Sequence, residues 1–140
     1  MSDIVRFSVS LEADLLERFD HHCTEGKFAT RSEAIRQLLR EALVDEAVSE
    51  HPEATEAAGT LTLVYDHHRP GLTEKLTEIQ HRHNHLIVST THVHLDHHLC
   101  LEVLILRGRA DKLRELAAEL RGTKGIRKGQ LVLATTPDIP

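Results

Sequence analysis

The chain has 140 residues, of which 40% are hydrophobic and only 3% aromatic, and its net charge is −5 with the histidines neutral. This length suits one compact domain or two very small ones, and the acidic charge argues against a general binder of polyanions. The sequence has no apolar run that could cross a bilayer, no signal-peptide pattern and only two cysteines, which excludes a disulfide framework. We therefore expect a cytoplasmic protein without a membrane partner and with an aliphatic core.

The first part of the chain has the pattern strand, helix, helix. Apolar and polar side chains alternate from Val5 to Leu11, which predicts a half-buried strand. Helical spacing follows from Glu12 to Glu25, and Gly26 ends it. Thr30 and Glu33, in the stretch TRSE, form the capping box that starts a second helix. Because the single strand has no partner within this small unit, we expect it to pair with the same strand of a second chain.

Residues 49–60 are polar and small, and they lack apolar periodicity. We interpret them as a linker between a first domain, residues 1–48, and a second domain, residues 61–140. The second domain has the predicted order strand, helix, strand, strand, helix, strand, at residues 61–66, 71–81, 86–95, 99–107, 110–121 and 130–135. This βαββαβ order is typical of a ferredoxin-like α+β domain, in which helices cover one face of an antiparallel sheet. The other face is left to pack against another copy.

Seven of the twelve histidines lie in the short segment that ends at Cys100. His92 and His94 are two residues apart on a predicted strand, so both project from the same face. A tight turn at residues 96–98 would place Cys100 opposite His94. Thiolate and imidazole ligands exclude Mg²⁺ and Ca²⁺ and favour Ni²⁺, Cu²⁺, Zn²⁺ or Co²⁺. Planar geometry would select nickel or copper and tetrahedral geometry zinc, so the metal stays open at this point.

His81 ends the preceding helix and is not expected to reach this point within one chain. Packing of two sheets could deliver it from a neighbouring chain, which would give three nitrogens and one thiolate. The alternative is a solvated polar strand face with Cys100 as a small core residue. The other histidines of the segment are interpreted as surface residues or weak secondary metal contacts; they are His83, His85, His97 and His98.

A competing motif is HVHLDH, from His92 to His97, which fits the H-x-H-x-D-H pattern of metallo-β-lactamase-like hydrolases. Such enzymes resemble a long αββα sandwich with further metal ligands far downstream. Here residues 99–140 contain no histidine at all. We therefore expect that the protein is not an enzyme.

Three features together resemble the nickel-responsive transcriptional regulators of the NikR type: RSEAIR in the first unit, the βαββαβ order, and the spacing QH…HVH…C followed by LE. This resemblance runs from end to end. It implies a ribbon-helix-helix domain joined to an ACT-like metal-sensing domain, assembled as a homotetramer that is a dimer of dimers. It also implies one Ni²⁺ per subunit in a planar site, held by His92, His94 and Cys100 of one subunit and His81 of another.

Glu102 lies two residues beyond Cys100 on the same strand face. We interpret it as a hydrogen-bond acceptor that orients a ligating imidazole, although a solvent-facing strand residue is the alternative.

The polar face of the first strand would form half of a two-stranded ribbon, which fits the major groove of DNA. This face consists of Arg6, Ser8 and Ser10, and the resemblance implies that these residues read the bases of palindromic operator half-sites. The start of the second helix could hold a backbone phosphate on its free N–H groups. The residues there are Thr30, Arg31 and Ser32.

Glu33 is the candidate ligand of a secondary cation. Some relatives of the NikR type carry an acidic residue where this chain has Gln37, and the neutral amide weakens the case for that second site.

The resemblance implies a repressor of nickel-uptake genes that binds its operator when nickel is bound. Two rival functions stay open: a nickel buffer or chaperone without a role on DNA, and a ribbon-helix-helix repressor that senses a small organic ligand.

Overall fold

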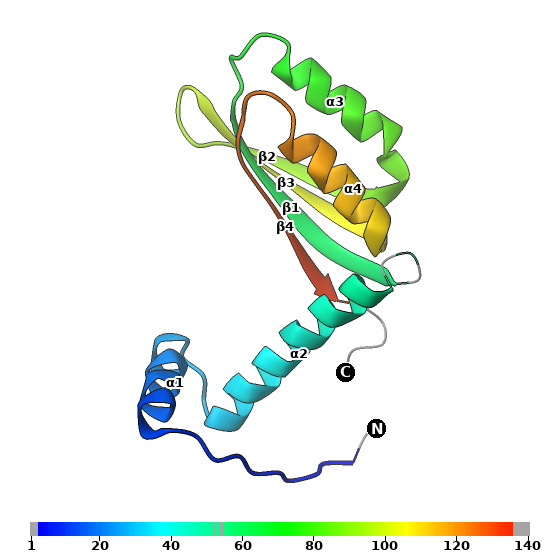
Figure 1. The fold of residues 1–140 in the computed structure, drawn as a ribbon. Coiled ribbons are helices and arrows are strands. Elements are labelled where there is room, and N and C mark those ends of the chain that lie inside the picture. Colours follow the sequence, from blue (N-terminus) through cyan, green and yellow to red (C-terminus); the bar gives the residue numbers. More distant parts are fainter. Residues whose placement is uncertain (1–2, 52, 54, 136–140) are drawn as a thin grey trace. The chain divides into compact units, whose positions relative to one another are not determined.

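The computed structural model describes residues 3–51, 53 and 55–135, and the chain divides into two compact units, residues 1–41 and 42–140. The elements in chain order (Figure 1) are α1 (Ala13–Glu25), α2 (Arg31–Glu50), β1 (Glu56–Asp66), α3 (Leu72–Arg82), the 3-10 turn η1 (Asn84–Leu86), β2 (Ile87–His94), β3 (Leu99–Arg109), α4 (Ala110–Arg121) and β4 (Ile126–Thr135). In the described part of the chain, none of the helices has the length and apolar character needed to span a membrane.

Helix α1 spans nearly the predicted residues, and α2 begins where the second helix was predicted to begin. Gly26 directly follows α1, but the left-handed residue of the turn is Lys27, with φ of 56°, while φ of Gly26 is −78°. The hydroxyl of Thr30 accepts the backbone N–H of Glu33 at 3.1 Å, which is one half of the predicted capping box. The Glu33 carboxylate pairs with Arg36 instead of reaching back to the cap.

The predicted strand from Val5 to Leu11 is not formed in the single chain. Residues 3–12 have no regular secondary structure, and their apolar side chains are exposed, with Phe7 at 71% and Val9 at 64%. The physical reason is that a strand exists only when its N–H and C=O groups pair with a neighbouring strand. The alternating sequence pattern is present, but the described part of the first unit supplies no second strand.

The second unit is a four-stranded antiparallel sheet in the order β2-β3-β1-β4, with α3 and α4 on one face (Figure 1). This arrangement confirms the predicted ferredoxin-like fold. Several strands are longer than predicted: β1 begins at Glu56 and β4 at Ile126. The predicted linker, residues 49–60, thus includes the end of α2 and the start of β1, while Pro52 and Ala54 lie outside the described residues.

The start of β1 was not predicted because its residues are small and lack an apolar pattern. Ala57 and Gly59 are buried there, in the same alternation as the later leucines of β1. Glycine is required at position 59, because a β-carbon would collide with the backbone carbonyl of Val132 in β4. Gly59, which looked like a linker residue, is therefore small because β1 and β4 approach closely.

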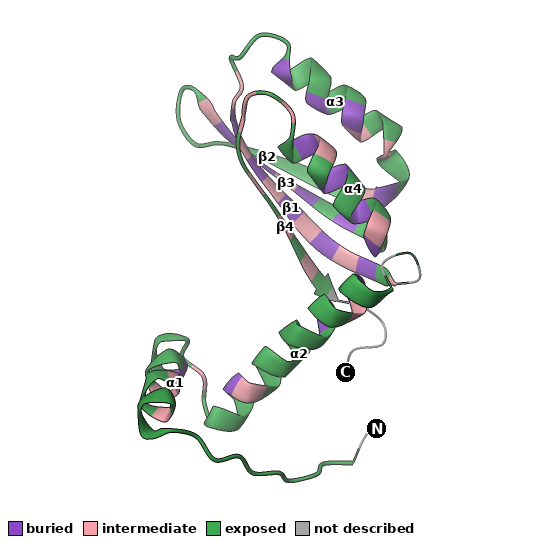
Figure 2. Ribbon diagram, viewed as in Figure 1, coloured by how far each residue is buried: buried purple, intermediate pink, exposed green. Residues whose placement is uncertain are grey.

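The core lies between the sheet and the two helices, as the alternating purple segments of Figure 2 show. Its fully buried large aliphatic side chains are Leu61, Leu63, Leu76, Ile79, Leu104, Leu106, Leu113, Leu116 and Leu120, joined by Val48 from the end of α2. Burying one such side chain contributes about 1.5–3 kcal/mol. The second unit therefore has its own core, which holds the sheet and α3 in fixed positions.

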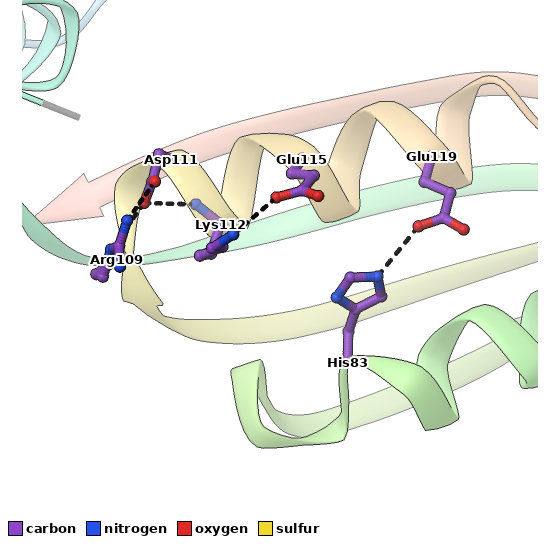
Figure 3. A network of polar contacts seen from close by, with 6 residues as sticks. All are labelled: His83, Arg109, Asp111, Lys112, Glu115 and Glu119. Carbon is purple, nitrogen blue, oxygen red and sulfur yellow. Dashed lines mark hydrogen bonds and ion pairs between the residues drawn. The ribbon is translucent and has the colours of Figure 1, made fainter. Parts of the chain in front are cut away.

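The end of α3 is tied to α4 by polar contacts. Glu119 of α4 accepts a hydrogen bond from Arg82. It also accepts one from Nε2 of His83 at 3.1 Å, which Figure 3 shows. The Arg82 guanidinium, together with His83, lowers the pKa of the Glu119 carboxyl. These contacts fix the last turn of the helix that carries His81.

Candidate metal centre

The pairing of β2 with β3 sets the positions of the histidines and the cysteine. His94 lies opposite Cys100, and His92 lies opposite Glu102. Directly opposed residues point to the same face of a sheet, and here it is the helix-covered face, because Cys100 is only 3% exposed. The two histidines are exposed because β2 is the edge strand. The register therefore places two accessible imidazoles beside one buried thiol.

Glu102 is buried, with 1% of its surface exposed, and does not face solvent. Its carboxylate accepts hydrogen bonds from three donors, namely the Tyr65 hydroxyl at 3.0 Å, the Gln80 amide at 3.0 Å and the Thr90 hydroxyl at 3.1 Å. Nε2 of His92 lies 3.1 Å from the same carboxylate. A buried charge needs such partners, so Glu102 connects α3, β1 and β2 in one network.

This network fixes the imidazole of His92. A carboxylate accepts hydrogen bonds, so Nε2 of His92 carries the proton and Nδ1 keeps a lone pair that can bind a metal. Burial is the main cause of a raised pKa of Tyr65, and the negative charge of Glu102 is the second cause. The hydroxyl of Tyr65 therefore keeps its proton and donates it in a hydrogen bond. Nδ1 of His92 is therefore the atom suited to metal ligation.

The sequence-based interpretation missed three members of the network: Tyr65, Gln80 and Thr90. A signal was present for Tyr65, because it continues the buried alternation of Leu61 and Leu63 on β1. A tyrosine at a core position needs a hydrogen-bond partner for its hydroxyl.

His81 is exposed on α3, while the preceding residue, Gln80, points to Glu102. It borders a hollow of about 230 Å³ whose other lining residues are Thr77, Gln80, Asn84 and Ile87. Within residues 3–51, 53 and 55–135, no three His, Cys, Asp or Glu side chains already form a closed set of metal ligands. A single chain thus brings His92, His94 and Cys100 to one face without adding His81 to them.

These residues fit a nickel ion chemically. Imidazole nitrogens and a thiolate are the ligands that late transition metals prefer, and a buried acceptor behind one imidazole is a usual support of such sites. This fit rests on the kind of donor atoms and on the position of His92, His94 and Cys100 on one face of the sheet.

The candidate DNA-contacting residues lie in two places in the first unit. Arg6, Ser8 and Ser10 are exposed, as are the apolar residues between them. At the start of α2 the side chain of Arg31 is already engaged: it donates two hydrogen bonds to Asp20, each of 2.7 Å, and these lower the pKa of the Asp20 carboxyl. The Thr30 hydroxyl caps α2, and Ser32 is exposed.

Glu33, the candidate ligand of a second cation, already pairs with Arg36. Gln37 donates a hydrogen bond of 3.0 Å to Glu41. Because the Gln37 amide is neutral, it adds no negative charge beside Glu33 that could help to bind a cation.

Comparisons with known proteins agree with both parts of this description. Residues 58–134 match the family model described as NikR C terminal nickel binding domain, and residues 5–46 match the model described as ribbon-helix-helix protein, copG family. Among solved structures, an uncharacterised protein from Thermotoga maritima matches with a TM-score of 0.52 and 17% identity, over 57% of this chain and 99% of its own. That likeness concerns the fold alone.

Several curated relatives match almost the whole chain. A protein of Nitratidesulfovibrio vulgaris (strain DSM 19637 / Miyazaki F), named "Putative nickel-responsive regulator", is 51% identical over 136 residues, or 97% of this chain and 96% of its own. Proteins with the same name from Geobacter sulfurreducens and Trichlorobacter lovleyi are 49% and 47% identical, covering 97% and 99% of this chain and 96% and 99% of their own. The chain therefore belongs to the NikR family of nickel-responsive regulators.

Proposed function

We propose that this protein is a cytoplasmic repressor that binds operator DNA when Ni²⁺ occupies a site shared by two subunits, and that it controls nickel-uptake genes. The observation that carries this proposal is the β2–β3 register, which places His92, His94 and Cys100 on one face with Glu102 buried behind His92. Family membership supports nickel as the signal and the ribbon-helix-helix unit as the DNA-binding part.

In the proposed site, His92, His94 and Cys100 of one subunit and His81 of another subunit hold one ion per subunit. Nickel would supply a link between the thiolate and imidazoles of one chain and the imidazole of its neighbour. Glu102 holds the His92 ring, and Cys100 loses its proton on binding, so affinity should rise with pH. The exposure of His81 in the single chain supports a ligand that meets its partners across an interface.

The residues around Glu102 also connect the two sides of the proposed site. Gln80 of α3 and His92 of β2 contact the same buried carboxylate, and Gln80 directly precedes His81. A change in the position of His92 would therefore be transmitted through Glu102 to the end of α3 that carries His81. This hydrogen-bonded path favours ordering of α3 when the ligands are engaged.

The first unit supplies the DNA contacts. Two copies of residues 5–11 would pair as an antiparallel ribbon, which buries Phe7 and Val9 between the chains and turns Arg6 towards the major groove. Ser8 and Ser10 would lie on the same polar face. Two such ribbons in a homotetramer, a dimer of dimers, would read the two half-sites of a palindromic operator.

Ion binding and DNA binding must then be coupled. If Ni²⁺ tightens operator binding by some factor, operator DNA must tighten Ni²⁺ binding by the same factor. The two affinities should be measured in both orders, with an operator fragment selected from the upstream region of the host's nickel-uptake genes. Equal operator affinity with and without Ni²⁺ would contradict the repressor mechanism and leave a nickel buffer.

The metal site is tested by an absorbance titration of the reduced, metal-free protein with Ni²⁺. Cys100→Ser should remove the thiolate-to-nickel charge-transfer band, whereas Cys23→Ser, which changes the other buried cysteine, should keep it. Arg6→Ala should keep the band and lose operator binding. A band of unchanged intensity in Cys100→Ser would refute the proposed ligand set.

A further inference from the structure

An ion pair with two parallel hydrogen bonds joins α1 to the start of α2 in the first unit. Nε and Nη2 of Arg31 donate to the two carboxylate oxygens of Asp20, and both distances are 2.7 Å. Arg31 is the first residue of α2, whereas Asp20 belongs to α1. The side chain of Arg31 is therefore held in place by a carboxylate from a different helix.

This pair leaves part of the Arg31 guanidinium free. A guanidinium carries five N–H donors in one plane, and Asp20 accepts one from Nε and one from Nη2. Within the part of the chain that the structure describes, the Arg31 side chain makes no other hydrogen bond. The N–H groups of Nη1 and Nη2 that point away from Asp20 form a second fork, which matches the geometry of a phosphate. The side chain is 59% exposed, so a ligand can reach this fork.

The start of α2 lies beside the segment that carries the proposed base-reading residues. Ser32, the residue after Arg31, lines a hollow of about 630 Å³ together with Arg6 and Phe7. The Thr30 hydroxyl is already used, because it accepts the backbone N–H of Glu33. Arg31 is thus the cationic side chain at this end of α2, next to the proposed DNA-contacting strand.

We propose that Asp20 is a positioning residue for DNA binding, which holds the guanidinium of Arg31 so that its free fork meets a phosphate of the operator backbone. This inference rests on the proposed function and adds to it a residue that does not itself touch DNA. An acidic side chain near DNA would ordinarily weaken binding. Asp20 acts in the opposite direction because it acts through Arg31.

Two effects of Asp20 oppose each other. Its carboxylate repels a phosphate and offsets the charge of Arg31, but the two side chains are 43% and 59% exposed, so water and salt screen this repulsion. The carboxylate also orders a long side chain that DNA binding would otherwise have to order. We expect ordering to be the larger effect, so removal of the carboxylate should weaken DNA binding.

The test is the affinity for the operator fragment, measured by fluorescence anisotropy with Ni²⁺ present and at increasing NaCl concentrations. Asp20→Asn keeps the size of the side chain but removes its charge and one acceptor oxygen. Operator affinity should fall about three- to tenfold. The slope of log affinity against log salt should become shallower by about 0.9 for each phosphate contact that is lost.

A double-mutant cycle shows whether Asp20 acts through Arg31. Arg31→Ala should lose operator affinity and reduce the salt slope. Adding Asp20→Asn to Arg31→Ala should cause no further loss, because the side chain that Asp20 positions is then absent. A loss of the same factor in both backgrounds would overturn the proposal and leave Asp20 with a structural role. A higher affinity and a steeper slope in Asp20→Asn would also overturn it, since Asp20 would then compete with the phosphate.

The second unit offers a matched control. Arg109 and Asp111 form a similar pair at the start of α4, with hydrogen bonds of 3.1 Å from Nε and 2.6 Å from Nη2. Asp111→Asn should leave both the operator affinity and the salt slope unchanged. An equal loss in Asp111→Asn and Asp20→Asn would contradict a specific role of Asp20.

The proposed function and this inference fail in different ways. If the wild-type protein does not bind the operator fragment with Ni²⁺ present, the proposed function fails and the role of Asp20 fails with it. If the wild-type protein binds and Asp20→Asn binds equally well with the same salt slope, only the role of Asp20 is refuted.

Discussion

The segments 5–11 and 61–65 carry the same alternation of apolar and polar residues, but among the described residues only the second segment has neighbouring strands to pair with. Leu61 and Leu63 of β1 are fully buried, because β3 and β4 flank this strand and two helices cover its face. Phe7 and Val9 are mostly exposed, because the described residues of the first unit contain no strand to pair with them. One unit thus completes its fold within the chain, and the other is proposed to complete its fold with a second chain.

The proposed metal ligands show the same division. His94 and Cys100 meet through strand pairing inside the second unit, whereas His81 is exposed on α3. The incomplete parts of the molecule are thus those proposed to act between subunits. A regulator whose signal must reach DNA benefits from this, since assembly then joins the signal site to the DNA-binding surface.

The largest effect is expected from Phe7→Asp. A buried charge in the proposed ribbon should prevent pairing and lower operator affinity by about a hundredfold or more. Gel-shift titration measures the loss, and the nickel band should persist. Phe7→Leu is the control and should stay within about tenfold of wild type. Normal operator binding by Phe7→Asp would show that residues 5–11 do not form the dimer ribbon.

Leu104→Ala tests the core of the second unit, whose sheet is paired within one chain. Leu104 is fully buried in the sheet, so the substitution should lower the free energy of unfolding by about 2–5 kcal/mol. Val88→Ala, at an exposed position of β2, should cost less than about 0.5 kcal/mol. Urea unfolding followed by circular dichroism compares the two, and equal costs would contradict a core centred on β3.

Glu102→Gln probes the support behind the proposed ligands. The amide keeps the shape of the side chain but replaces one acceptor oxygen by an N–H₂ donor among other donors, so the network that holds His92 loses an acceptor and its negative charge. Nickel affinity should fall by about 10–100-fold. Glu115→Gln, on the exposed face of α4, should leave nickel affinity unchanged. Competition with a chelator measures both, and equal affinities would remove Glu102 from the account.

The smallest effect concerns the Asp20–Arg31 pair of the first unit. Hydrogen bonds from Arg31 hold the pKa of Asp20 below its ordinary value of 3.8. The pair therefore stabilises the fold above that value, and its contribution is lost as the pH falls through the folded-state pKa. Wild type should be more stable than Asp20→Asn at pH 7, and the difference should shrink towards pH 3. A constant difference in urea midpoints would contradict this.

Much of the second unit could be predicted from the sequence because its signals are local. Two-residue spacing and a turn of three residues were enough to place His94 opposite Cys100. The partners of Glu102 could not be predicted in the same way, because they depend on which sheet face the helices cover. The hydrogen bond between His68 and the carbonyl of His97 was missed for a similar reason, since it joins residues 29 apart in the sequence.

The predicted first strand stays a prediction, because its expected partner is the same strand of a second chain and the described residues of one chain supply no other strand. The early start of β1 was missed because Ala57 and Gly59 look like linker residues. At Gly59 the small size instead reflects the close approach of β1 and β4.

The central claim, that two chains share each nickel site, is tested most directly by mixing two inactive variants. His81→Ala and Cys100→Ser should each lack the thiolate-to-nickel band when assembled alone. When the two are unfolded together and refolded as mixed assemblies, about a quarter of the sites should combine an intact triad with an intact His81 from the neighbour. Recovery of about that fraction of the wild-type band would support a shared site. No recovery in verified mixed assemblies would mean that each chain holds its nickel alone and would contradict a site shared by two chains.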